Sequence, residues 1–178
     1  FNGVYLADFH NGQILEHTQF IDKKVVDSML ILAQVQDVEP FIYTFGEEHQ
    51  VYYRHATNSG SIAYLASLEK DGRVKHTPEF IFHEDENVAG FLLIGTMKNL
   101  EPIYHRLKEK HFDHLNSYFA EDVSMKGYYW LQAFHQQANK GNMVEKLVDR
   151  LNFPLNKTMV FGDYLNDLDM FEVAGYSV

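Results

Sequence analysis

The sequence predicts an α/β fold, because segments with helical periodicity alternate with short apolar runs along its 178 residues. Two observations carry this prediction. Residues 158–171 combine an apolar run, an acidic loop and a helical repeat, which is the order strand, loop, helix. Upstream, residues 22–134 alternate between helix and strand patterns, and we expect them to form one layer with its helices on one face of a sheet.

The first expected element is a β-hairpin. Asn11-Gly12 lies between the runs 4–9 and 13–17, and Asn-Gly is the strongest local signal for a tight turn between strands. Helices are expected where apolar residues recur three and four positions apart, with Asp22 capping the first, and these segments are residues 22–36, 59–69 and 100–110. Strands are expected at the intervening apolar and aromatic runs, which are residues 40–45, 50–55, 88–96, 114–119 and 128–134.

The composition excludes several classes of protein and site. A net charge of −10 without a basic cluster argues against a nucleic-acid-binding surface. The sequence has no cysteine, which excludes disulfides and thiolate zinc sites, and its ten histidines lack the spacing of zinc ligands. Apolar runs such as residues 91–94 are too short to span a bilayer, and no signal peptide is visible. We therefore expect a cytoplasmic protein that binds neither nucleic acid nor membrane.

Asp163 and Asp167 are the candidate metal ligands. They follow the apolar run Met159–Phe161, and Asn166 is expected to cap the next helix. In open parallel sheets, ligands bind beyond the carboxyl ends of the strands, where both carboxylates would face. Such a pair suits Mg²⁺, which binds through one or two carboxylates and substrate phosphate. A calcium loop is excluded, because the stretch lacks the glycine and the glutamate that such a loop requires.

Lys140 is the candidate cation. It begins a helix whose apolar side runs from Met143 to Leu151, and a lysine at a helix start opposes the helix dipole. A nearby phosphate or carboxylate would explain it, and a solvated surface lysine is the alternative. The acidic loop has a similar alternative, because Asp and Asn also cap helices and form turns.

Gly162-Asp163-Tyr164-Leu165-Asn166-Asp167-Leu168-Asp169-Met170 resembles the G-D-x-x-N-D-x-x-M motif of haloacid dehalogenase superfamily phosphatases, particularly their Cof-type branch. Lys140-Gly141 matches the K-G motif that precedes it, and Asn2-Gly3-Val4 resembles the Asn-Gly-Ala segment before the cap domain. His135-Gln136-Gln137 departs from the Pro-x-Gly that often lies before the lysine.

The resemblance implies a Rossmann-like core with a parallel sheet and an inserted α/β cap of the C2 type. Residues 1–20 would be a core segment and hairpin leading to the cap, residues 21–127 the cap, and residues 128–178 a core segment with the lysine and acidic motifs. The nucleophile motif D-x-D-G-T is not found, because Asp8 has no second aspartate two residues on. We expect that motif and the Ser/Thr motif upstream of Phe1, so this chain alone would be inactive.

The implied activity is hydrolysis of small phosphorylated metabolites, such as sugar phosphates, by a Mg²⁺-dependent phosphatase. The attacking aspartate, outside this chain, would form an aspartyl-phosphate. In this scheme Asp163 and Asp167 hold the metal, Asn166 helps fix the loop or the phosphate, and Lys140 neutralises charge on the nucleophile and the phosphoryl group. Two alternatives remain open: a sugar phosphomutase of the same superfamily, and a non-catalytic binding module that lacks the nucleophile.

Overall fold

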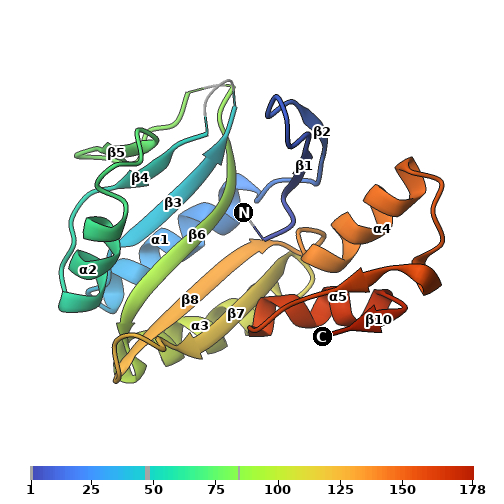
Figure 1. The fold of residues 1–178 in the computed structure, drawn as a ribbon. Helices are drawn as coiled ribbons and strands as arrows, with labels where there is room; N and C mark the ends of the chain where they lie inside the picture. Colours follow the sequence, from blue (N-terminus) through green and yellow to red (C-terminus); the bar gives the residue numbers. More distant parts are fainter. Residues whose placement is uncertain (1, 47–48, 84) are drawn as a thin grey trace.

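A six-stranded sheet is the largest element of the computed structural model, which describes residues 2–46, 49–83 and 85–178 (Figure 1). Its strand order is β5-β4-β3-β6-β8-β7. The pair β4 and β5 is parallel, and the other neighbouring pairs are antiparallel. The strands are β3 (Pro40–Phe45), β4 (Val51–Tyr53), β5 (Val74–His76), β6 (Asn87–Thr96), β7 (Leu115–Glu121) and β8 (Tyr128–His135). The predicted α/β class is confirmed.

The core lies on both faces of β6, whose residues 88–95 are all buried. On one face, Phe91 and Leu93 belong to a cluster with side chains of α1 (Lys23–Val35) and α3 (Met97–His111). Figure 1 shows these two helices behind the sheet. Met29 of α1 and Ile103 of α3 have no solvent exposure, so this cluster holds the two helices on the sheet.

The opposite face of the sheet carries α2 (Ser59–Ser67), and the expectation that all helices cover one face is therefore wrong. Tyr64 of α2 packs against the second cluster, and its hydroxyl lies 3.0 Å from that of Tyr43. A Cβ on Gly60 would lie 2.8 Å from Ile94, so the missing side chain lets α2 approach β6 closely. Alternation along β6 explains this arrangement, because successive side chains of a strand point to opposite faces.

Two further expectations are corrected by the sheet. The short strand β5 was not expected, and it contains only one apolar residue, Val74. The expected division between residues 127 and 128 would also cut the sheet, because β8 lies between β6 and β7 and pairs with both. The chain leaves the large sheet only after His135.

Two small sheets accompany the large one. The hairpin expected at Asn11-Gly12 is present as antiparallel β1 (Tyr5–Ala7) and β2 (Ile14–His17). At the other end of the chain, β9 (Met159–Val160) and β10 (Tyr176–Ser177) pair in parallel. This C-terminal segment also contains α4 (Lys140–Arg150), which packs on α5 (Leu168–Val173), and the 3₁₀ turns η1 (Leu155–Lys157) and η2 (Leu165–Asp167).

The C-terminal segment presents apolar side chains to solvent. Met159 is 54% exposed and Phe161 is 67% exposed, whereas Val160 between them is buried. A parallel strand is normally covered on both faces, so β9 keeps one uncovered apolar side in this structure. None of the described helices is both long enough and apolar enough to cross a bilayer.

The core of α1 yields a stability test within one helix. Met29→Ala should lower the free energy of unfolding by about 2–5 kcal/mol, because it removes a fully buried side chain and leaves a cavity. Ile31→Ala, two residues away and 62% exposed, should change it by no more than about 0.5 kcal/mol. Urea unfolding followed by circular dichroism measures both, and equal effects would contradict the described packing.

Candidate active site

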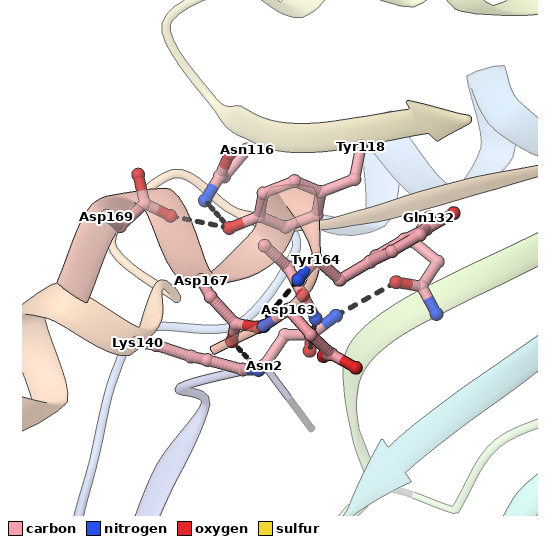
Figure 2. A network of polar contacts seen from close by, with 10 residues as sticks. Asn2, Asn116, Tyr118, Gln132, Lys140, Asp163, Tyr164, Asp167 and Asp169 are labelled. Atoms are coloured by element: carbon pink, nitrogen blue, oxygen red, sulfur yellow. Dashed lines mark hydrogen bonds and ion pairs between the residues drawn. The ribbon is translucent and has the colours of Figure 1, made fainter. Parts of the chain in front are cut away.

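The four residues singled out in the sequence lie on one cavity. Lys140, Asp163, Asn166 and Asp167 all line a space of about 400 Å³ between the acidic loop and the face of the large sheet. The sheet contributes Tyr118 from β7 and further side chains from β8. Figure 2 shows the loop and sheet side chains converging on one network. The fold therefore brings together residues that are 27 positions apart in sequence, such as Lys140 and Asp167.

Asp167 is the centre of the acidic loop, although only 4% of it is exposed. Its Oδ1 accepts a hydrogen bond from Lys140 Nζ, and the two groups form an ion pair. Its Oδ2 accepts hydrogen bonds from the backbone N–H of Asp163 at 3.0 Å and of Tyr164 at 3.1 Å. Both carboxylate oxygens are thus engaged, and the buried charge is compensated by a cation and two amides.

Gly162 is required by the position of this carboxylate. A Cβ at residue 162 would lie 2.4 Å from the Cβ of Asp167 and 2.7 Å from its carboxyl carbon. Such approaches are far inside van der Waals contact, so a side chain would push Asp167 away from the loop amides. The glycine at the end of β9 therefore allows the chain to fold back over its own aspartate.

The environment of Asp167 sets its charge. Burial alone raises its pKa, but hydrogen bonds from Lys140 and from the amides of Tyr164 and Asp163 outweigh burial and lower the pKa below its ordinary value. Asp167 is therefore ionised at neutral pH, and the ion pair with Lys140 is maintained there.

Lys140 begins α4 as expected, and its position now has a reason. Asn139 caps the helix by accepting a hydrogen bond from the amide of Asn142 at 2.7 Å. The cationic side chain opposes the helix dipole, but it is paired with the Asp167 carboxylate. A nearby carboxylate, one of the two groups that would explain a lysine at this position, is therefore present, and the ammonium group still lines the cavity.

Asp163 differs from Asp167 in its freedom to bind a ligand. Its side chain is exposed and lines the cavity, and its hydrogen bond to Asp167 comes from its backbone amide. Within the described residues, no group of three or more His, Cys, Asp or Glu side chains converges as a metal site. The donor set still fits Mg²⁺, which takes one or two carboxylates with substrate phosphate and water. Asp163 would be the direct ligand, because both oxygens of Asp167 already have partners.

Asn166 does not have the role expected for it in the helix. It lies inside the 3₁₀ turn η2, and the residue that precedes α5 is Asp167. The Asn166 side chain instead donates a hydrogen bond to Asn2 Oδ1 at 2.7 Å, and Asn2 donates to Gln132 Oε1 at 3.0 Å. The Asn166 side chain therefore joins the acidic loop to the start of the chain and does not cap a helix.

A second polar bridge joins the sheet to α5. The Tyr118 hydroxyl donates to Asp169 Oδ2 at 2.7 Å and accepts from Asn116 Nδ2 at 2.7 Å (Figure 2). Burial and the adjacent carboxylate of Asp169 raise the pKa of Tyr118 far above its ordinary value, so the phenol remains a donor. This contact fixes β7 beside the acidic loop.

Several cavity residues were not identified from the sequence. Tyr118, Trp130 and Gln132 face the cavity from the sheet, whereas the sequence predicts only strands at residues 114–119 and 128–134. Trp130 Nε1 also donates to Asp122 Oδ2 at 2.8 Å. Strand alternation places every second residue of β8 on this face. The cavity becomes evident only when the acidic loop is seen opposite that face.

Comparisons with known proteins identify the family of this chain. The family model for haloacid dehalogenase-like hydrolases matches residues 1–178. Phosphatase YwpJ of Bacillus subtilis is 34% identical over 100 residues, which are 55% of this chain and 33% of that protein.

Two solved structures share the fold. A haloacid dehalogenase-like hydrolase from Bacteroides thetaiotaomicron has a TM-score of 0.75 at 19% identity, covering 98% of this chain and 61% of that one. Another from B. subtilis has a TM-score of 0.75 at 20% identity, covering 99% and 66%. The chain therefore spans less than two thirds of the length of these relatives.

The lowered pKa of Asp167 yields a pH-dependent stability. An aspartate with a lowered folded-state pKa contributes stability that is complete above its unfolded-state pKa, about 3.9, and is lost as the pH falls through the folded value. Wild-type protein should therefore lose more unfolding free energy between about pH 5 and pH 2 than Asp167→Asn does. Urea unfolding at a series of pH values measures the difference.

The control is Asp149→Asn, which removes an exposed carboxylate of α4 outside the cavity. This variant should keep the wild-type pH dependence. Identical pH dependence in wild type and Asp167→Asn would contradict the assigned contacts of Asp167.

Proposed function

Because this chain belongs to the haloacid dehalogenase-like hydrolases, we propose that the protein containing it is a Mg²⁺-dependent phosphatase of small phosphorylated metabolites, such as sugar phosphates. The observation that supports this most is the Lys140–Asp167 ion pair beside the exposed carboxylate of Asp163 on one cavity wall. Phosphoryl transfer depends mainly on positioning and on stabilisation of charge. A relative of this chain, phosphatase YwpJ, is named for the same type of reaction.

Each residue of the loop has a distinct proposed role. Lys140 places a positive charge at the cavity wall, where it stabilises charge on the phosphoryl oxygens. Asp167 acts as a positioning residue, because it holds both Lys140 and the amides of the loop. Asn166 fixes the loop against Asn2, and its role as a phosphate ligand is secondary to that contact. Mg²⁺ bound by Asp163 would supply further positive charge to the same oxygens.

The nucleophile is proposed to be an aspartate outside residues 1–178, as the family resemblance implies. Its carboxylate oxygen attacks phosphorus, and the bond from phosphorus to the leaving alcohol oxygen breaks. Water then hydrolyses the aspartyl-phosphate and releases inorganic phosphate. This chain would contribute the electrostatic half of the site, and the proposal places no attacking group among its own residues.

Asp163→Asn tests the metal role in the protein that contains this chain. Wild type should release inorganic phosphate from glucose 6-phosphate when Mg²⁺ is present, and the variant should lose about two powers of ten or more in kcat. The substitution removes one charge and little volume from an exposed side chain, so thermal unfolding should remain cooperative. Colorimetric phosphate release measures the activity.

The control for this substitution is Asp149→Asn, which should keep wild-type turnover because Asp149 lies outside the cavity. Full activity of Asp163→Asn would overturn the metal assignment. Transfer of the phosphoryl group to another hydroxyl, without net phosphate release, would identify a phosphomutase instead. Absence of any phosphoryl turnover in wild type would leave a binding module.

Lys140→Met tests the cation. The substitution keeps an apolar stem but removes the charge, and it should lower kcat by about two to three powers of ten, as for one preorganised electrostatic contact. Lys157→Met, at an exposed residue of η1, is the matched control and should leave turnover unchanged. A loss of only a few-fold in Lys140→Met would return this lysine to a structural role.

A further inference from the structure

Gln132 lies on the sheet where two cavities adjoin. It lies on β8 between the outer strand β7 and the central strand β6, on the face that borders the acidic loop. Its side chain lines the cavity of about 400 Å³ that contains Lys140 and Asp163, and also a second cavity of about 190 Å³. Gln132 is therefore the residue at which the two spaces meet.

In the described part of the chain, the hydrogen bonds around Gln132 occupy its side-chain oxygen and leave its side-chain nitrogen available. Asn166 donates to Asn2, and Asn2 donates to the side-chain oxygen of Gln132. The oxygen of Gln132 is thus occupied, while its amide nitrogen has no hydrogen-bond partner among the residues that the structure describes. Figure 2 shows this nitrogen on the side of the amide group that faces away from Asn2. A ligand in the cavity would meet a donor and not an acceptor.

The backbone explains how Asn2 reaches this position. Gly3 has a φ of +80°, and a Cβ there would lie 2.0 Å from the carbonyl oxygen of Asn139. Only glycine permits that contact between the start of the chain and the residue that caps α4. The hydrogen-bonded side chains of Asn166, Asn2 and Gln132 are therefore anchored next to Lys140, which follows Asn139 directly.

The described residues around Gln132 carry no unpaired positive charge. The second cavity is lined by Asn2, Tyr43, Gln132 and Phe134, none of which is charged. In the first cavity, Lys140 is the one cation among the described lining residues, and it is paired with Asp167. A second phosphate or a carboxylate on the leaving group would have no cation to meet at the sheet end.

The remaining carboxylate near the sheet is already satisfied. Asp122 accepts hydrogen bonds from Trp130 Nε1 at 2.8 Å and from the amide of Ser124 at 2.7 Å. The indole of Trp130 and the ring of Tyr118 supply apolar surface on the same wall. Such a wall suits the carbon skeleton of a ring that also carries hydrogen-bonding oxygens.

We propose that Gln132 is a specificity-determining residue that donates a hydrogen bond from its amide nitrogen to an oxygen of a neutral, hydroxyl-bearing leaving group. This inference rests on the proposed phosphatase function, because it assumes that the phosphoryl group lies at Lys140 and Asp163. Asn2 and Asn166 are positioning residues that fix the orientation of the Gln132 amide. The acidic loop, which is proposed to bind the phosphoryl group, thereby also orients Gln132 toward the leaving group.

The test compares two phosphate monoesters of similar size in the protein that contains this chain. Glucose 6-phosphate carries ring hydroxyls, whereas cyclohexylmethyl phosphate has none. Gln132→Met keeps the shape of the side chain but removes the donor. It should lower kcat/KM for glucose 6-phosphate about 3- to 10-fold, the usual value of one neutral hydrogen bond, and leave cyclohexylmethyl phosphate unchanged. The control Gln136→Met, at an exposed residue just beyond β8, should change neither value.

A binding measurement separates this inference from the proposed function. Calorimetry with the non-hydrolysable phosphonate analogues of both esters should show the same selective loss for Gln132→Met. If wild type hydrolyses neither ester but Gln132→Met weakens only the hydroxylated phosphonate, the phosphatase assignment fails and the role of Gln132 stands. An equal effect of Gln132→Met on both ligands, or none on either, would overturn the role of Gln132 whatever the turnover.

Discussion

The ion pair between Lys140 and Asp167 is the interaction on which the acidic loop depends. Asp167 is nearly inaccessible to solvent, and a buried carboxylate without partners is costly enough to unfold its surroundings or to take up a proton. The ammonium group of Lys140 and the amides of residues 163 and 164 satisfy it completely. The contacts of Asp167 therefore fix the loop, the start of α4 and the segment after β9 relative to one another. Asp163, in the same loop, has an exposed side chain.

Two polar bridges attach this loop to a sheet that is remote in sequence. Tyr118 and Asp169 are 51 positions apart, and Asn2 lies 164 positions from Asn166 and 130 from Gln132. Each bridge has a neutral side chain at its sheet end, Tyr118 as a donor and Gln132 as an acceptor, so the contacts are directional without adding charge. Their common effect is to fix the acidic loop and α5 against the sheet face on the other side of the cavity. Geometry of this kind governs phosphoryl transfer more than the reactivity of any one side chain does.

The cavity is electrically asymmetric along its length. Lys140, Asp163 and Asp167 lie at the loop, whereas the sheet end presents aromatic rings, amides and the hydrogen-bonded carboxylate of Asp122. Under the proposed function, a phosphate monoester would lie with its phosphoryl group at the loop and its uncharged portion at the sheet.

Local sequence determined the elements and the loop chemistry. The Asn11-Gly12 hairpin, the three helices of the first 111 residues and the order of strand, loop and helix at the acidic motif follow from periodicity and turn residues. Lys140 was singled out because its charge opposes the dipole of its own helix, which is a purely local conflict. These features were predictable because they depend on neighbours within one or two turns of chain.

Tertiary structure alone decided which of those residues meet and how they are used. Nothing near Asn166 in sequence indicates that its amide is bonded to Asn2 and not to the backbone of its own helix. The side chains of Trp130 and Gln132 look like ordinary strand residues until the acidic loop is placed opposite β8. Likewise, α2 lies on the face opposite α1 and α3, because a strand buried on both sides offers either face to a helix. Such pairings are set by packing between distant segments, and a one-dimensional pattern specifies a face but not the partner that covers it.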